Sequence, residues 1–325
     1  MKKILALVLA VAMLASFAAC GASEAEYKLG MGISVSLDST TEETAQADAT
    51  VATVVLDADG KIVAADLDCA QTKVKAADVD DLSKVDVRTK KEKKEDYNMK
   101  GASPIGKEWY EQAAAFAEKM IGKTVADIEG IETEVKGGHN VAVDADLYAA
   151  CTMDITAFKA AFVAACKDAQ AKTFKATADS FKLGLAVSTD VSGSKATEAQ
   201  LYSTFSAAVV DADGKVLATI VDAIQPKVTF DEDGVVVEKT YKNTKRVLKE
   251  DYNMKDASPI GKEWYEQAAA YTDLMVGKTA ADIEAIETEV KNNHNVAVDA
   301  DLYAACTMDI TAFKADMVKA INAAK

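Results

Sequence analysis

Residues 94–100 read KEDYNMK and open a stretch, Lys94–Ala160, that the chain contains a second time at Lys249–Ala315. The two stretches differ at only ten of 67 positions, with an offset of 155 residues. Similarity at this level marks a tandem duplication of one domain. We therefore predict two homologous domains, at 27–170 and 181–325, joined by a polar linker at 171–180.

Upstream of the repeated stretch, the two copies have diverged but keep the same turn signal. Asp57–Lys61 and Asp211–Lys215 both read DADGK between apolar runs, which predicts a β-hairpin in each copy. Asp231–Gly234 predicts a further hairpin in the second copy. The Asp-Xaa-Asp-Gly sequences share part of a calcium-loop pattern but lack its later glutamate, so we interpret them as turns and predict no metal site.

The repeated stretch predicts a helical middle. Ser103 as N-cap and Pro104 at the first helical position predict a helix that runs to about Met120. Thr124 and Asp127 form the pattern of a capping box and predict a short second helix.

The end of each copy predicts strands followed by a last helix. Val141–Val143 and Ala149–Ile155 read as strands, and Asp154 or Thr156 would cap the final helix. Because strands stand before and after the helical middle, the predicted class of each domain is α+β.

Composition excludes several classes of protein. The 325 residues are 50% hydrophobic and include only three prolines, which is typical of a packed globular chain. The formal net charge is −15, from 52 acidic and 37 basic residues. An acidic chain without an extended basic patch is a poor candidate for binding nucleic acid.

The N-terminus has the layout of a secretory signal peptide. Lys2 and Lys3 precede an apolar run, Ile4–Leu14, and small residues stand before Cys20. The alternative, a transmembrane helix, is disfavoured because the run is short. We predict a signal peptide at 1–19 and acylation of Cys20, such as palmitate, with 20–26 as a tether on the extracellular face of the cell membrane.

Residues for conventional catalysis are few. The only histidines are His139 and His294, one in each copy, and neither stands in a nucleophile motif. Four further cysteines lack any CxxC or metal-type spacing. They could pair in disulfides, but the favoured alternative is buried thiols at Cys69, Cys151, Cys166 and Cys306. Redox or group chemistry in this chain would therefore have to come from a bound group.

One motif indicates what that group is. Asp146–Thr152 and Asp301–Thr307 both read DLYAACT, which resembles the Asp-x-x-Ser/Thr-Gly-Ala-Ser/Thr signal at which a flavin transferase attaches FMN to a threonine. The spacing from Asp to Thr matches, whereas Ala-Ala-Cys replaces the central residues. The resemblance implies that Thr152 and Thr307 carry FMN and that the transferase reads Asp146 and Asp301. Taken from the residues alone, each threonine is equally well a β-branched strand residue.

The whole domain supports the same interpretation. Asp96–Lys100, Gly106–Trp109 and Gly122–Thr124, with the terminal Asp146–Thr152, resemble the repeat unit of FMN-carrying lipoproteins of Gram-positive extracellular electron transfer. This resemblance implies one covalent FMN per domain, a membrane electron donor and extracellular electron acceptors. Aromatic side chains suited to stack on the flavin, or else to fill the core, are Trp109, Tyr148, Trp264 and Tyr303.

We therefore expect a lipid-anchored electron carrier rather than an enzyme with a substrate of its own. The alternative is a solute-binding or adhesive surface lipoprotein that has no redox group. A flavin-dependent reductase would need an added catalytic domain, for which the two repeats leave no room.

Overall fold

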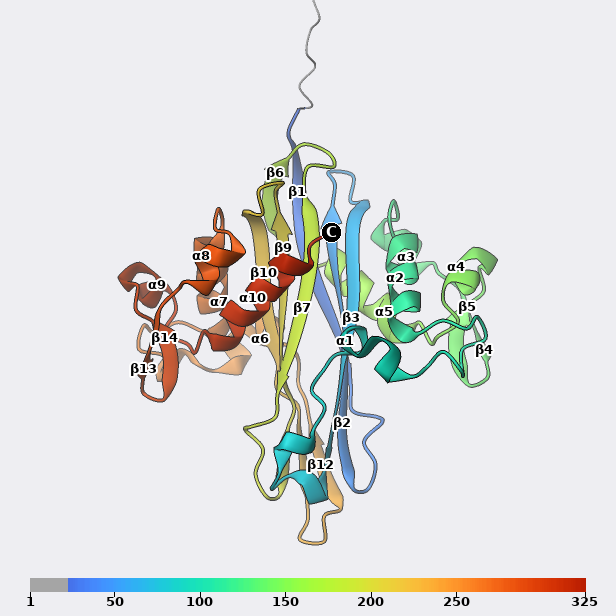
Figure 1. Cartoon of the computed structure of the whole chain (residues 1–325), viewed down its shortest axis with the longest axis horizontal. Helices are drawn as coiled ribbons and strands as arrows, with labels where there is room; N and C mark the ends of the chain where they lie inside the picture. The colour runs from blue at the N-terminus through green and yellow to red at the C-terminus, as the bar shows by residue number, and fades with distance from the viewer. Residues whose placement is uncertain (1–22) are drawn as a thin grey trace, which may run out of the picture.

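A computed structural model describes residues 23–325 (Figure 1). It is 31% helix and 33% strand, and the predicted α+β class is confirmed. The predicted signal peptide and Cys20 lie outside the described residues. Across residues 23–325, every helix is too short or too polar to cross a bilayer.

The first copy is built on a four-stranded antiparallel sheet. Strands β1 (Ala25–Ser36), β2 (Thr44–Leu56) and β3 (Ile62–Lys75) form a meander, and β6 (Lys172–Ala176) pairs with β1 at the edge. The predicted hairpin between β2 and β3 is confirmed. Strand β6 comes from the segment for which we predicted a linker, so this segment is part of the sheet.

The second copy repeats this meander with β7 (Lys182–Asp190), β9 (Tyr202–Val210) and β10 (Val216–Ile224), in the order β10-β9-β7. A small third sheet contains β8 (Glu198–Gln200), β11 (Lys227–Phe230) and β12 (Val236–Thr240). The hairpins predicted at the two turns of this copy are both confirmed.

The two large sheets pack face to face, and helices cover their outer faces (Figure 1). Helices α2 (Trp109–Lys119) and α5 (Thr156–Cys166) lie on the first sheet, and α7 (Trp264–Met275) and α10 (Thr311–Ala323) lie on the second. The core between the sheets holds apolar residues of both copies, among them Leu29, Val51, Leu185, Phe205 and Ile220. The chain is therefore a four-layer sandwich with the order helix, sheet, sheet, helix.

The remaining elements are short and lie mostly at the flanks. In the first copy they are α1 (Lys90–Lys93), α3 (Val125–Glu129), β4 (Thr133–Lys136), β5 (His139–Ala142) and α4 (Ala145–Ala150). In the second they are α6 (Lys245–Leu248), α8 (Ala280–Glu284), β13 (Thr288–Lys291), β14 (His294–Ala297) and α9 (Ala300–Ala305). Single 3-10 turns are η1 (Ala76–Asp78), η2 (Leu82–Lys84), η3 (Lys94–Tyr97), η4 (Lys249–Tyr252) and η5 (Lys255–Ala257).

The helix predicted from Pro104 begins later than expected. Its N-cap is Glu108, which forms a capping box with Glu111, so the prediction of Ser103 as N-cap is wrong. Ser103 Oγ instead accepts a hydrogen bond from the Gln112 side chain at 3.0 Å. The capping box predicted at Thr124 and Asp127 is confirmed.

The prediction of a strand at Ala149–Ile155 is also wrong. The Asp144 carboxylate accepts a hydrogen bond from Leu147 N at 2.8 Å and caps α4, which holds Ala149 in a helix. The final helix begins at Thr156 with Ile155 as N-cap, so the prediction of Asp154 or Thr156 as N-cap is wrong by one residue. Asp154 Oδ1 still accepts a hydrogen bond from the N–H of Thr156 at 2.9 Å.

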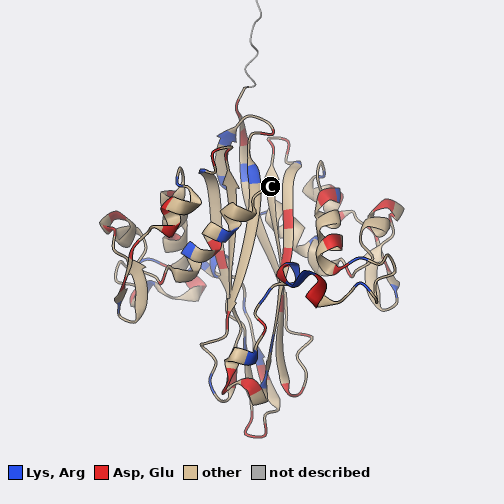
Figure 2. Ribbon diagram, in the orientation of Figure 1, with Lys and Arg blue, Asp and Glu red and all other residues tan. Residues whose placement is uncertain are grey.

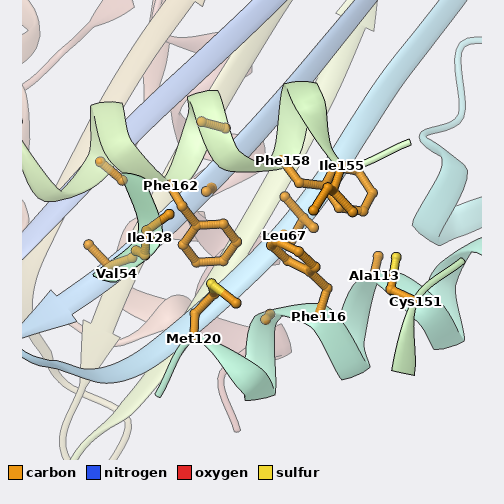
Figure 3. Close-up of a cluster of buried hydrophobic side chains, with 14 of the residues drawn as sticks. Val54, Leu67, Ala113, Phe116, Met120, Ile128, Cys151, Ile155, Phe158 and Phe162 are labelled. Carbon is orange, nitrogen blue, oxygen red and sulfur yellow. The ribbon is translucent and has the colours of Figure 1, made fainter. Parts of the chain in front are cut away.

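A compact aromatic core lies between the helices and sheet of each copy. Figure 3 shows it in the first copy, where Phe116 and Phe162 lie beside Met120, Leu67 and Ile128. Because α2 and α5 both insert side chains here, the core fixes these helices on the sheet. Charged residues gather in the flanking helices and loops, and the central strands carry few (Figure 2).

The copies are also joined by a buried ion pair. Arg246 Nη2 lies 3.1 Å from Asp168 Oδ2, and both side chains are only 8% exposed. The Gln170 amide donates to the Arg246 carbonyl oxygen at 2.8 Å, while Arg246 donates to the Gln170 carbonyl oxygen at 2.9 Å. This contact fixes the end of the first copy against the second.

Candidate functional site

Thr307 is held in place by a buried glutamine. The backbone N–H and the hydroxyl of Thr307 both donate to Gln267 Oε1, at 2.9 and 3.2 Å. The amide nitrogen of Gln267 in turn donates to Ser258 Oγ at 2.9 Å and to the Lys262 carbonyl oxygen at 3.0 Å. Because all donors and acceptors of this amide are used, the threonine has a defined position at the end of a polar chain.

The first copy repeats this arrangement. Thr152 N and Oγ1 donate to Gln112 Oε1 at 2.9 and 3.2 Å, and Gln112 donates to Ser103 Oγ and to the Lys107 carbonyl oxygen. Both glutamines are fully buried, and the two threonines are 7% and 8% exposed. The sequence divergence elsewhere in the copies has left this geometry unchanged.

A short helix, α9, directly precedes its C-terminal cap, Cys306, and Thr307, and so positions the threonine beside Gln267. Asp299 caps α9 by accepting a hydrogen bond from Leu302 N at 2.8 Å, and the helix ends at Cys306, whose φ of −145° is extended. Cys306 and its counterpart Cys151 are fully buried in the apolar cores. Burial raises the pKa of both thiols to about 11, so they are neutral at physiological pH.

Thr307 lines a cavity of about 360 Å³. Its walls include the predicted residues Trp264 and Tyr303, with Tyr252, Lys245 and His294. This volume lies in the range of small-molecule sites, and the walls combine aromatic faces with a few polar groups, as such sites do. The structure thus brings three of the predicted residues of the second copy to one cavity.

Lys245 is a feature of this cavity that sequence reasoning missed. Its ammonium lies 4.5 Å from the ring centres of Tyr202 and Tyr252 and 5.5 Å from that of Trp264. The residue is 5% exposed, and burial lowers the pKa of its amine to about 7 despite the Asp222 carboxylate. The quadrupoles of the aromatic faces favour the charged form of Lys245, whereas burial favours the neutral form.

The predicted aspartates lie elsewhere. Asp146 and Asp301 are exposed in the first turn of α4 and α9. Each lines a separate surface hollow, of about 560 Å³ in the first copy and 590 Å³ in the second. Lys123, which lies just before α3, lines the first hollow, and Lys278, just before α8, lines the second. The aspartates are thus open to a protein that docks from solvent.

The predicted aromatic residues fall into two environments. Trp109 and Trp264 are 3% exposed and pack edge-on against Phe158 and Phe313, with ring centres 5.9 and 5.7 Å apart. Both tryptophans therefore belong to the cores, and Trp264 also faces the cavity. Tyr148 and Tyr303 are half-buried, and the ammonium groups of Lys136 and Lys291 lie 4.3 and 4.2 Å from their ring centres.

The histidines belong to small hairpins. Asn292 and Asn293 have φ of 50° and 65°, and Gly137 and Gly138 have 59° and 85° at the equivalent positions. Positive φ at both central residues is the requirement of a tight two-residue hairpin turn, which glycine and asparagine meet best. His139 and His294 follow these turns and are exposed, and His294 lies at the rim of the cavity.

Sequence reasoning also left Gln112 and Gln267 without a role. Each stands three residues after the tryptophan that begins its helix, so the two side chains share a helix face. This three-residue spacing is the signal by which the sequence could have identified the two glutamines.

No protein-family profile, curated protein or solved structure matches this chain.

Proposed function

We propose that the chain is an electron carrier anchored through Cys20 to the outer face of the cell membrane, with FMN joined by a phosphoester to Thr152 and Thr307. The observation that supports this proposal most strongly is the threonine–glutamine pair. A hydroxyl at the position predicted for attachment has the same fixed partner in both copies, and in the second copy it lines an aromatic cavity.

The residues around Thr307 fit a flavin in chemical type. The flavin ring is flat and aromatic and becomes negatively charged on reduction, and the cavity offers aromatic walls and an ammonium group. The bound flavin would supply reversible uptake of electrons. Gln267 would hold the threonine, Trp264 and Tyr252 would shield the ring from water, and Lys245 would provide positive charge.

The partners follow from the same proposal. A flavin transferase would read the exposed Asp146 and Asp301, with FAD as the source of the flavin. A membrane donor would supply electrons and extracellular acceptors would take them. The formal charge of −15 favours acceptors that are cationic or metal ions over anionic ones.

The test is to produce residues 23–325 together with a flavin transferase and FAD, and to measure the intact mass and the visible absorbance after denaturation. We expect a mass increase of two FMN groups, reduced to one in Thr152→Ala or Thr307→Ala and to none in the double variant. Thr279→Ala removes a capping hydroxyl outside the site and is the matched control, which should keep both groups.

An unmodified, colourless protein from both this system and the native host would overturn the proposal. The alternative, a solute-binding or adhesive lipoprotein, would then take its place. The paired hollows beside Asp146 and Asp301 favour that alternative, because each copy offers an open surface site of similar volume and largely equivalent lining.

A further inference from the structure

The two copies differ in what surrounds the equivalent lysines, Lys90 and Lys245. Lys90 lies over Tyr97 and Trp109, at 5.2 and 5.7 Å from the ring centres, as Lys245 lies over Tyr252 and Trp264. The third ring around Lys245 is Tyr202, whose hydroxyl accepts a hydrogen bond from the ammonium at 3.1 Å. The first copy has Asp48 at the position of Tyr202.

Strand pairing establishes that these positions are equivalent. Asp48 stands opposite Ser36 in the β1–β2 pair, and Tyr202 stands opposite Asp190 in the β7–β9 pair. In the next strand of each copy, Cys69 pairs with Thr50 and Ala223 pairs with Thr204. The first copy therefore has a thiol where the second has a methyl group. Three differences between the copies therefore lie in these strands, Asp48 for Tyr202, Cys69 for Ala223 and Ser36 for Asp190.

In the first copy Asp48 stands in the place of Tyr202, and its negative charge acts to raise the pKa of Lys90. Its carboxylate accepts hydrogen bonds from Gln46 and Gln71, both at 2.7 Å. Burial acts to lower the pKa of Lys90, but negative charge on Cys69, Tyr97 and Asp48 outweighs it and the pKa is raised. The Cys69 thiol is neutral at neutral pH, because burial raises its pKa to about 11.

Lys245 has no carboxylate at that position. The groups that face it are Tyr202 from β9, Tyr252 from η4 and Asp222 from β10, and Lys291, His294, Tyr303 and Asp309 line the rest of the cavity. Asp222 is already engaged, since it accepts hydrogen bonds from Arg246 N at 3.0 Å and Ala223 N at 2.7 Å. The equivalent carboxylate of the first copy is Asp68, which accepts hydrogen bonds from Lys91 N and Cys69 N. This group is therefore present in both copies and does not distinguish the sites.

We propose that the two sites are electrostatically unequal, and that Lys245 offers its positive charge to the negatively charged, reduced flavin ring of the second site, whereas the charge of Lys90 is already balanced by Asp48. The inference rests on the proposed function. On reduction, each flavin takes two electrons from the donor and one proton from water and gains one negative charge. In the second site Lys245, where neutral, takes one further proton from water.

The consequence is a difference in midpoint potential. A charge that stabilises the reduced form raises the potential, so the second flavin should have the more positive value. The test measures the midpoint potential of the flavinylated single-site variants Thr152→Ala and Thr307→Ala. Each is titrated with dithionite while mediators equilibrate the flavin with an electrode. Lys245→Met should shift the second site at least tenfold toward the oxidised form, which is about 30 mV for a two-electron couple.

Three control variants show whether the difference in potential comes from the charge of Lys245. Lys90→Met in the first site should change the potential by less than Lys245→Met does in the second, because its charge is already balanced. Tyr202→Asp should move the second potential toward the first, and Lys245→Arg, which keeps the charge, should largely preserve it. Flavinylated protein with equal potentials at the two sites, or with a potential unaffected by Lys245→Met, would overturn the inference and leave the proposed function intact.

A second readout needs no flavin. In the chain produced without transferase, NMR of lysine labelled with ¹³C at Cε should show Lys245 titrating at a lower pH than Lys90, with both signals assigned by the Met variants. Asp48→Asn should lower the pKa of Lys90 and leave that of Lys245 unchanged. Equal titration of the two lysines would contradict the inequality. Absence of flavin from the intact mass would overturn the proposed function and this inference together.

Discussion

Tyr271 and Phe116 occupy the same place in the two cores, and the difference between them is one hydroxyl group. Tyr271 is fully buried, and within residues 23–325 nothing is in position to bond its oxygen. Leaving a buried polar group unpaired costs about 1–3 kcal/mol. Phe116 fills the equivalent position of the first copy with carbon alone.

We expect Tyr271→Phe to raise the free energy of unfolding by about 1 kcal/mol, because the ring packing is kept and the unpaired hydroxyl is lost. Urea unfolding monitored by circular dichroism would measure it. The reverse substitution Phe116→Tyr is the control and should destabilise the protein. A loss of stability in Tyr271→Phe would show that the hydroxyl has a bonding partner.

Asp316 makes stability depend on pH. Its carboxyl is 2% exposed, and burial raises the pKa to about 7 although Ser188 donates a hydrogen bond to it at 2.6 Å. Between the ordinary pKa near 3.8 and 7, the folded chain keeps this proton while the unfolded chain has lost it. The contribution of this group to stability therefore falls as pH rises through that interval.

We expect Asp316→Asn to stabilise the protein at pH 8 relative to wild type by on the order of 2 kcal/mol, and to have little effect at pH 4. Thermal unfolding at both values is the measurement. The first copy has Ala161 at this position, which makes Asp316→Ala a second variant with the same expected sign. An Asn variant that loses stability equally at both pH values would contradict the assignment.

Residue roles were predictable only where a local motif carries them. Thr152 and Thr307 stand at a fixed spacing from an aspartate, so the resemblance to a flavinylation signal selected them as candidates. Lys245 did not stand out, because the aromatic rings around it come from Tyr202, 43 residues earlier in the chain, and from Tyr252 and Trp264. Only the packing of α6 between β10 and α7 brings these groups together.

At the scale of elements, glycines set the distance between helix and sheet. A Cβ placed on Gly32 would lie 2.2 Å from the Ala161 carbonyl oxygen and 2.3 Å from Ala165 N. On Gly184 it would lie 1.9 Å from the Ala320 carbonyl oxygen. All of these atoms are backbone, so α5 and α10 rest directly on their strands.

We expect Gly32→Ala to lower the free energy of unfolding by about 1–3 kcal/mol or more, because α5 must move away from β1. Chemical denaturation would measure the change. Gly101→Ala is the control: a Cβ there meets nothing within 4 Å, and the effect should stay within about 0.5 kcal/mol. Equal effects of the two substitutions would contradict this account of the helix packing.

Element boundaries were predicted well where the turn chemistry is local and poorly where two signals compete. The Asp-Gly hairpins and the Thr124 capping box are short-range patterns, and the structure keeps them. At 149–155 the apolar residues favoured a strand, but Asp144 caps a helix that runs to Ala150, and the helix prevails at its start. At 103–108 the capping pair Glu108 and Glu111 prevails over the Ser-Pro signal.

At the scale of the whole molecule, the two copies share one interior. Apolar side chains of both sheets form a single core, β6 extends the first sheet, and the ion pair of Asp168 with Arg246 is buried between the copies. The sequence predicted the duplication but not this packing, because the apolar residues of a strand do not show what will cover them. Only the fold showed that the predicted linker contributes a strand.

We therefore expect the chain to unfold in one cooperative transition rather than as two independent domains. Calorimetry should give equal calorimetric and van't Hoff enthalpies for residues 23–325. Arg246→Met leaves Asp168 buried without its partner, and should lower the stability of that single transition by about 3–5 kcal/mol. Two resolved transitions in the wild-type chain would contradict a shared interior.

The arrangement of the two sheets indicates how the chain evolved. Strand β3 lies against β7 and β1 lies against β10, and these two contacts exchange when the copies are interchanged, as they do across the two-fold axis of a homodimer. The chain thus has the form of a symmetric pair fused into one gene product. In a pair of identical subunits, any mutation alters both halves at once. Fusion ends that constraint, so that Asp48 and Tyr202, or Phe116 and Tyr271, can be inherited side by side as separately selectable traits.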